Sequence, residues 1–376
     1  CNVILTVCFL QISASSSPSI LHPSFPVLNL LPTSSASPIA KWLIAVTVCV
    51  ALMVPATGQR VASTNKNGPA VPTLASIAQS LQSQDYTVEQ YRRFRDESGN
   101  LVTVRERLKV GANGTDRPDF EITFLGVVGE PAGSALSVEW QQAYNRFGHL
   151  FFRHGSFQVR DLAKAAANYT LHDYGQVVRA GRLARRMVVF PVSIDKAIWV
   201  VDIDSATSVP LCVAEFDNSL QLRANIEVLT FTPSVQVITP TQSAANVTPM
   251  VNYAAAETFL GLPTGLVDPI VSVTPDYMLE SVEVHDDPIN GREKLVMSYS
   301  DGIDQFMVVQ TLNTLDPFAG LPSSGGGAHT IGRFRDRAVS ALGFWDDQVT
   351  FHVPGRGSLR LLDDVASGIF LQVLSN

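Results

Sequence analysis

Residues 185–191 read RRMVVFP, residues 196–204 read KAIWVVDID, residues 209–217 read VPLCVAEFD, and residues 220–231 read LQLRANIEVLTF. These four apolar runs are rich in β-branched and aromatic residues, and polar segments such as Asp204–Ser208 separate them as turns. In the fourth run, apolar and polar residues alternate, which is typical of an antiparallel strand with one solvent-facing side. Short links make consecutive strands neighbours, so we predict an antiparallel meander over residues 185–231.

The second run, Ile198–Val201, is apolar on both sides, so we expect both of its faces to be covered. Within the meander, no acid, base and nucleophile are spaced as catalysis requires. Cys212 lies between Leu211 and Val213 and is expected to be a small buried residue of the strand. The meander is therefore predicted to have a structural role and not a catalytic one.

The N-terminal residues differ in composition from the rest. Residues 1–40 are rich in Ser and Pro and carry no charge, and the first Met of the chain is Met53. We interpret 1–40 as a disordered upstream extension. Lys41, the apolar run WLIAVTVCVALMV and the small residues that follow predict a secretory signal peptide over 41–58, since thirteen residues are short for a membrane span. A buried core helix is the alternative.

Composition limits the possible functions of the 376-residue chain. The net charge is -7 and no basic block occurs, so nucleic acid is not an expected partner. Three of the four cysteines precede residue 50, and the one that remains, Cys212, can form neither an internal disulfide nor a zinc site by itself. The sequence leaves open whether the chain forms oligomers.

Outside the meander, the pattern predicts a first domain over 73–232, a linker over 233–250 that is rich in Ser, Thr and Pro, and a second domain over 251–376. Thr73 and Asp161 are expected to cap helices, and Ser137–Phe147 is expected to be a helix. The other predicted elements are the hairpin 86–95/101–110, strands at 119–128, 278–285, 293–300, 305–311, 333–342 and 348–353, and a helix after Ser358.

Several short motifs resemble the MucB/RseB family of periplasmic regulators of the envelope-stress response. They are Asn168-Tyr169, Gly181-Arg182 before an apolar strand, the hairpin Ile198–Asp204/Leu211–Asp217, and LVMSYSDG at 295–302, in which Ser300-Asp301-Gly302 is the most specific. The resemblance covers about residues 75–376. It implies an α+β fold, in which a LolA-like incomplete antiparallel β-barrel with helices is followed by a smaller α+β domain.

The resemblance also implies a function: an exported, periplasmic protein that binds the periplasmic segment of a membrane anti-sigma factor and senses lipid or lipoprotein in an apolar cavity. An acyl chain gains about 0.8 kcal/mol for each methylene that it buries. We expect the helix 137–147 and the strands of the meander to border such a cavity, although aromatic residues at this spacing also suit an ordinary core. The candidate lining residues are Trp140, Tyr144, Phe147, Val189, Trp199 and Val201.

Catalytic motifs are weak in this sequence. His149 and His154 are five residues apart, which does not place them on one face of a helix as metal ligands. Asp202-Ile203-Asp204 is explained by a hairpin, and Gly325-Gly326-Gly327 lacks the Lys-Ser/Thr of a phosphate-binding loop. We therefore predict no enzyme, cofactor or metal site. A LolA-like carrier of lipoprotein or lipid, and a secreted hydrolase of another type, are the alternatives.

Overall fold

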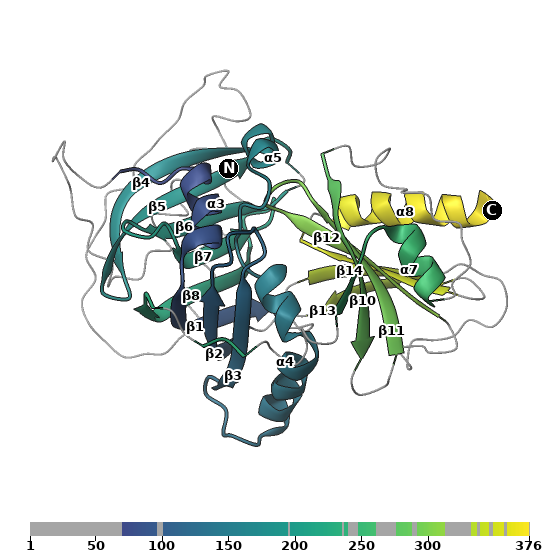
Figure 1. Cartoon of the computed structure of the whole chain (residues 1–376), viewed down its shortest axis with the longest axis horizontal. Coiled ribbons are helices and arrows are strands. Elements are labelled where there is room, and N and C mark those ends of the chain that lie inside the picture. The colour runs from purple at the N-terminus through teal and green to yellow at the C-terminus, as the bar shows by residue number, and fades with distance from the viewer. Residues whose placement is uncertain are drawn as a thin grey trace, which may run out of the picture. The chain divides into compact units, whose positions relative to one another are not determined.

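The computed structural model describes residues 70–95, 101–194, 196–234, 237–239, 247–260, 276–287, 292–312, 332–336, 339–345, 349–356 and 359–375. The chain divides into two units, Cys1–Met53 and Val54–Asn376. Every described residue belongs to the second unit. The expected extension over 1–40, the expected signal peptide over 41–58 and the glycines at 325–327 lie outside the described residues. The fold is α+β, with two antiparallel sheets and helices packed against each (Figure 1).

The first sheet has eight strands in the order β3-β2-β1-β8-β7-β6-β5-β4. The predicted meander is confirmed as β5 to β8, and the predicted hairpin as β1 and β2. β3 and β4 are the two edges, and no described pairing joins them, so the sheet is an open, incomplete barrel. The bounds are β1 (Tyr86–Arg95), β2 (Leu101–Gly111), β3 (Asp119–Val127), β4 (Tyr169–Arg179), β5 (Arg182–Pro191), β6 (Ile198–Asp204), β7 (Pro210–Phe216) and β8 (Leu222–Thr232).

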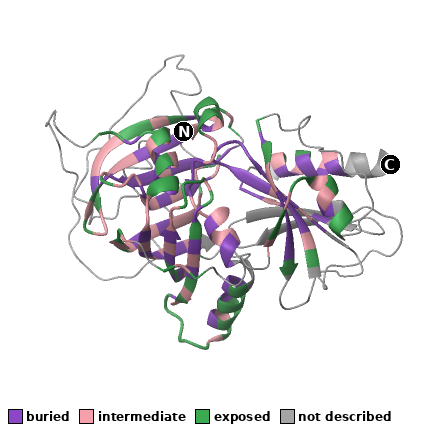
Figure 2. Cartoon of the chain, in the orientation of Figure 1, coloured by how far each residue is buried: buried purple, intermediate pink, exposed green. Residues whose placement is uncertain are grey.

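Alternation along the strands decides which residues face the helices. In β6, Trp199 and Val201 are fully buried and belong to a core cluster with helix residues. Asp202, between Val201 and Ile203, points to the opposite face and is held there by Arg179 and Arg186. Figure 2 shows the resulting mixture of buried and less buried residues along the strands.

Three helices pack against one face of this sheet: α3 (Leu74–Ser83), α4 (Ala135–Arg153) and α5 (Leu162–Asn168). The predicted caps are confirmed. Thr73 exchanges hydrogen bonds with Ser76 in a capping box, and Asp161 Oδ1 accepts from Lys164 N at 3.0 Å. The predicted helix 137–147 extends further, to Arg153, because residues 148–152 continue the same apolar pattern over β1–β3.

The second sheet has seven strands in the order β13-β14-β15-β12-β11-β10-β9. α8 (Leu359–Ser375) buries Leu362, Val365, Ala366 and Ile369 against it, at the helical spacing that the sequence predicts. The other elements are β9 (Val247–Met250), within the range expected to be a linker, α7 (Tyr253–Leu260), β10 (Met278–Asp287), β11 (Arg292–Ser300), β12 (Gln305–Leu312), β13 (Gly332–Asp336), β14 (Val339–Trp345) and β15 (Val349–Gly355).

One predicted strand was wrong, and one strand was not predicted. The segment 333–342, expected to be one strand, forms two paired strands, β13 and β14, with Asp336 opposite Val339. Residues 169–179, for which no element was predicted, form the edge strand β4, whose pairing with β5 is interrupted between Asp173 and Gln176. None of the helices in the described ranges is long and apolar enough to cross a membrane.

Candidate functional site

The candidate cavity residues lie in two separate core clusters on the helix-facing side of the first sheet. Trp140 and Tyr144 of α4 pack with β1–β3, whereas Val189, Trp199 and Val201 pack with α3 and α5. All five are buried. Phe147 belongs to α4, but its side chain is outside the described part of the structure. None of the five lines a cavity described below, so their role as a ligand surface remains a prediction.

A small hollow does lie inside the first sheet. It has a volume of about 50 Å³, and α3, the segment 152–159 and strands β1, β2, β7 and β8 line it, with Ile77, Leu81, Val88, Leu108, Phe157 and Val213 among the apolar side chains. One or two water molecules fit in this volume, since each occupies about 30 Å³ in the liquid. An acyl chain would therefore enter only if the helices moved away from the sheet.

A buried ion pair between Arg92 of β1 and Glu106 of β2 lies beside this hollow, and a hydrogen bond from Tyr144 connects it to α4. Glu106 accepts hydrogen bonds from Arg92 Nε at 3.1 Å, from Gln90 Nε2 at 2.6 Å and from the hydroxyl of Tyr144. Burial, followed by the charge of Glu106, raises the pKa of Tyr144 well above its usual value, so this phenol stays neutral. The network fixes α4 on the sheet. The sequence gives no sign of it, because polar Gln90 and Arg92 face inward.

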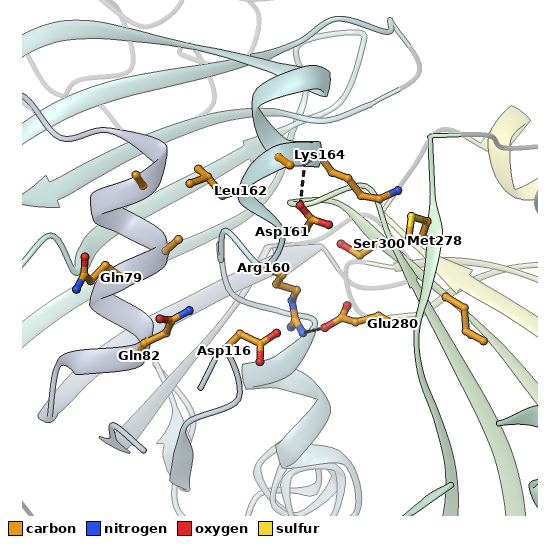
Figure 3. A pocket seen from close by; sticks show the side chains of 14 residues that line it. Gln79, Gln82, Asp116, Arg160, Asp161, Leu162, Lys164, Met278, Glu280 and Ser300 are labelled. Carbon is orange, nitrogen blue, oxygen red and sulfur yellow. Dashed lines mark hydrogen bonds and ion pairs between the residues drawn. The ribbon is translucent and has the colours of Figure 1, made fainter. Parts of the chain in front are cut away.

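A second cavity has a volume of about 770 Å³ and is open to solvent (Figure 3). Gln79 and Gln82 of α3 lie on one side of it, and Met278 and Glu280 of β10 lie on the other. Its full lining is Ala75, Ala78, Gln79, Gln82, Asp116, Arg160, Asp161, Leu162, Ala163, Lys164, Met278, Leu279, Glu280 and Ser300.

The charged side chains of this cavity are mostly held in place. Arg160 Nη1 lies 2.7 Å from Glu280 Oε1, and this ion pair connects the segment before α5 with β10. Asp161 caps α5, and the hydroxyl of Ser300 accepts from Gly302 N at 3.0 Å. The apolar side chains are open to solvent, since Leu162 is 42% exposed, Met278 57% and Leu279 37%. The cavity thus offers exposed apolar contacts beside fixed charges.

A cluster that contains two histidines lies between α4 and β10. His149 Nε2 lies 3.4 Å from His285 Nδ1, and His285 Nε2 lies 2.9 Å from Glu283 Oε2. Arg153 forms an ion pair with the same carboxylate, since its Nη1 lies 3.1 Å from Glu283 Oε1. Among the described residues, no group of His, Cys, Asp and Glu is arranged to hold a metal ion. No local pattern in the sequence connects His285 with His149, because 136 residues separate them.

Burial and neighbouring charges set the protonation states in this cluster. Burial, together with the charges of His285 and Arg153, lowers the pKa of His149 well below its usual value. Burial would raise the pKa of Glu283, but the hydrogen bond from His285 and the charge of Arg153 outweigh it and lower that pKa to about 2. The cluster therefore holds an ionised Glu283 and a neutral His149 at neutral pH.

Comparison with known proteins finds similar solved structures. No protein-family description and no curated protein matches the sequence. The crystal structure of MucB matches with a TM-score of 0.44 and 15% identity over 80% of this chain and 95% of that chain. The Pseudomonas aeruginosa MucA/MucB complex matches with a TM-score of 0.42 and 14% identity over 78% and 95%. A putative outer membrane lipoprotein-sorting protein domain from Vibrio parahaemolyticus matches with a TM-score of 0.19 and 9% identity over 44% and 92%. MucB is thus among the solved structures to which this chain is similar.

Proposed function

We propose that this protein is an exported, non-catalytic binding protein of the periplasm, which holds an extended segment of a membrane anti-sigma factor in the cavity between α3, α5 and β10. One observation carries the proposal: a large open cavity displays Leu162, Met278 and Leu279 to solvent beside polar side chains. An isolated chain gains nothing from exposing these groups, whereas a bound polypeptide would cover them. The class of partner is taken from the resemblance of the sequence motifs to the MucB/RseB family.

The composition of the cavity suits a polypeptide. Burying one apolar side chain of the partner against Leu162 or Leu279 contributes about 1.5–3 kcal/mol. The amides of Gln79 and Gln82, on the same wall, can both donate and accept hydrogen bonds with a peptide backbone. The one hydroxyl among the described lining residues, Ser300, is engaged with the backbone of its own turn. These features favour binding over catalysis.

We further propose that lipid occupancy of the sheet interior controls this binding through α3. One side of α3 supplies Ile77 and Leu81 to the interior hollow, and the other supplies Gln79 and Gln82 to the large cavity. An acyl chain that entered the interior hollow would displace α3, because the hollow holds only about 50 Å³. The outer cavity would change shape at the same time.

Binding of the partner is tested with a matched pair of variants in the full chain. Leu162→Ala removes an exposed side chain inside the cavity, and Leu183→Ala removes one of equal chemistry and similar exposure, 41%, on β5. We expect Leu162→Ala to weaken binding of the anti-sigma periplasmic segment about tenfold, corresponding to about 1.4 kcal/mol, and Leu183→Ala to leave it unchanged. Equal affinities of both variants and the parent chain would exclude the cavity as the binding site.

A LolA-like carrier of lipid or lipoprotein is the second candidate, and the apolar lining of the interior hollow favours it. The two candidates differ in what the protein carries when it is purified from the envelope. A regulator retains the anti-sigma segment and loses it when a fatty-acyl probe is added. A carrier retains lipid and transfers it to an acceptor, with or without the segment. Mass spectrometry of the purified protein distinguishes these outcomes.

A further inference from the structure

The turn between β11 and β12, residues Ser300–Asp304, joins the second sheet to the core of the first. Ile303, at its tip, is buried in the same cluster as Met187 and Val201 of the first sheet. Gly302 O accepts from Arg160 N at 2.9 Å, and Asp304 Oδ2 accepts from Ala197 N at 3.1 Å. The turn and its surroundings form what we call the joint, defined by Asp301, Asp304, Glu215, Lys196 and Arg356.

Asp301 has a full set of partners in the joint. Its Oδ1 accepts from Ile303 N at 3.1 Å and from Asp304 N at 2.8 Å. Its Oδ2 accepts from the Tyr169 hydroxyl at 2.8 Å and lies 2.9 Å from Lys196 Nζ. Four donors thus surround one buried carboxylate, and Lys196 supplies the opposite charge.

The other two carboxyl groups of the joint, Asp304 and Glu215, each have one oxygen without a hydrogen-bond partner among the described residues. Asp304 and Glu215 are both almost completely buried. Glu215 Oε2 lies 3.6 Å from Arg356 Nε, but among the described residues neither Glu215 Oε1 nor Asp304 Oδ1 has a hydrogen-bond partner. A buried carboxylate oxygen without a partner is costly, whereas a protonated one is not charged and can donate.

The charges of the joint do not balance unless a proton is bound. It contains three buried carboxyl groups and two buried cations, Lys196 and Arg356. Arg223, whose Nη1 donates to the carbonyl oxygen of Arg356 at 2.6 Å, is half-buried, so solvent screens its charge. Asp276 Oδ2 lies 3.4 Å from Lys196 Nζ, but its side chain is 54% exposed, so water solvates its charge. The neighbouring phenols of Tyr169 and Tyr277 are neutral and do not change the balance of charge. Three ionised carboxylates would outnumber the two buried cations by one, and an uncompensated charge in the interior is strongly unfavourable.

We propose that Asp304 and Glu215 bind one proton between them, and that the joint loses this proton as the pH rises through neutrality, which loosens the turn from the first sheet. Burial, followed by the negative charges of Asp301 and Glu215, raises the pKa of Asp304 to about 7, against the smaller opposing effects of Ala197 N–H and Arg356. The protonated site is neutral, and deprotonation restores the excess negative charge. The joint is thus a proton-binding site distinct from the large cavity.

The direction of the pH effect follows from linkage. In the unfolded chain Asp304 titrates near its usual value of 3.8, so between that pH and about 7 the folded state binds the additional proton. Stability from this site is complete at low pH and is lost as the pH rises through about 7. A single such group makes the unfolding equilibrium constant about tenfold larger at pH 8 than at pH 6.

The test compares three full-length proteins by urea unfolding between pH 6 and pH 8. Asp304→Asn keeps an oxygen that accepts from Ala197 N, and it balances the charges of the joint without a bound proton. The tenfold change in the unfolding equilibrium constant between pH 6 and pH 8 should therefore be absent from this variant. Asp276→Asn, which changes an exposed carboxylate of the same region, should retain it. Differences between the variants and the parent chain cancel the titration of histidines elsewhere. An unchanged pH dependence in Asp304→Asn would overturn the proposal.

Carboxyl carbon NMR of the parent chain gives an independent measurement if Asp304→Asn does not fold. We expect one buried carboxyl resonance to titrate near pH 7 and to be assigned to Asp304 or Glu215, with Glu215→Gln confirming the assignment. If both groups titrate below pH 5, the joint holds no such proton and the proposal fails. Neither measurement involves the anti-sigma segment or lipid, so the result does not depend on the proposed function.

Discussion

The hydroxyl of Tyr169, at the first residue of β4, donates a 2.8 Å hydrogen bond to Asp301 Oδ2 in the β11–β12 turn, 132 residues away. Both side chains are buried, and Asn168 adds a bond from Nδ2 to the carbonyl of Asp301 at 3.0 Å. Asn168-Tyr169 and Ser300-Asp301-Gly302 are two of the sequence motifs from which the family resemblance came. In this structure the two motifs contact each other and help to join the two sheets.

Removing this hydroxyl should destabilise the protein. Tyr169→Phe leaves one buried oxygen of Asp301 with one donor fewer, and we expect a loss of about 1–3 kcal/mol in the free energy of unfolding. Urea denaturation measures it. Tyr91→Phe, on the opposite face of the first sheet, serves as the control and should change stability by less than about 0.5 kcal/mol. Similar losses in both variants would show that the Tyr169–Asp301 bond contributes nothing specific.

Gly302 should not tolerate a side chain. Its φ is +105°, and a Cβ there would lie 2.7 Å from the carbonyl oxygen of Asp161. Strain and overpacking together predict that Gly302→Ala costs about 2–5 kcal/mol. Gly114, with φ +78° and open space around it, isolates the backbone strain alone, and Gly114→Ala should cost about 1–2 kcal/mol. Thermal or urea unfolding of the two variants tests this difference, which vanishes if the turn is not packed on Asp161.

The buried ion pair in the first sheet should be sensitive to removal of one partner. Glu106→Gln leaves Arg92 buried without its counter-charge, and we expect a loss of about 3–5 kcal/mol. Glu89→Gln removes a carboxylate that pairs with the exposed Arg105 and Arg107, and water compensates there, so its effect should be small. Near-ultraviolet circular dichroism during urea unfolding would follow Trp140 and Tyr144 nearby. Comparable effects of the two variants would contradict the assigned burial.

Acid should weaken the contact between α4 and β10. His149 is neutral in the folded protein because its pKa is lowered well below the usual value, whereas in the unfolded chain it takes up a proton near pH 6.5. Stability from this group is therefore present above pH 6.5 and is lost as the pH falls below it, by on the order of 1–2 kcal/mol at pH 5. Unfolding measured at pH 7 and pH 5 should show this loss in the parent chain and less of it in His149→Gln. The exposed His172→Gln should behave like the parent chain, and a flat pH profile for all three would refute the assignment.

Much of the first sheet could be predicted because its signals are local. Runs such as Ile198–Asp204 and Pro210–Phe216 are short, apolar and separated by turn residues, and Thr73 and Asp161 cap helices from the adjacent position. β4 was missed because an edge strand with polar Thr170, His172 and Asp173 has no clear alternation, and Gly175 interrupts its pairing. The local pattern therefore predicts central strands better than edge strands.

The candidate site was harder to predict because long-range contacts build it. Arg160 meets Glu280 across 120 residues, and His149 meets His285 across 136. The spacing of Trp140 and Tyr144 correctly placed both on the buried face of a helix. It could not show that Tyr144 would donate to Glu106, since inward-facing Arg92 and Glu106 look like residues of a solvated strand.

Ile303 completes the core of the first sheet from a point beyond the last strand of that sheet, β8, which ends at Thr232. A nascent chain that has emerged only to this strand consequently has a gap beside Met187 and Val201, and cannot close it until some seventy further residues have followed. The first sheet can therefore complete its core only after the β11–β12 turn has been synthesised. A fragment that ends between β8 and this turn would expose apolar side chains, which chaperones and proteases recognise.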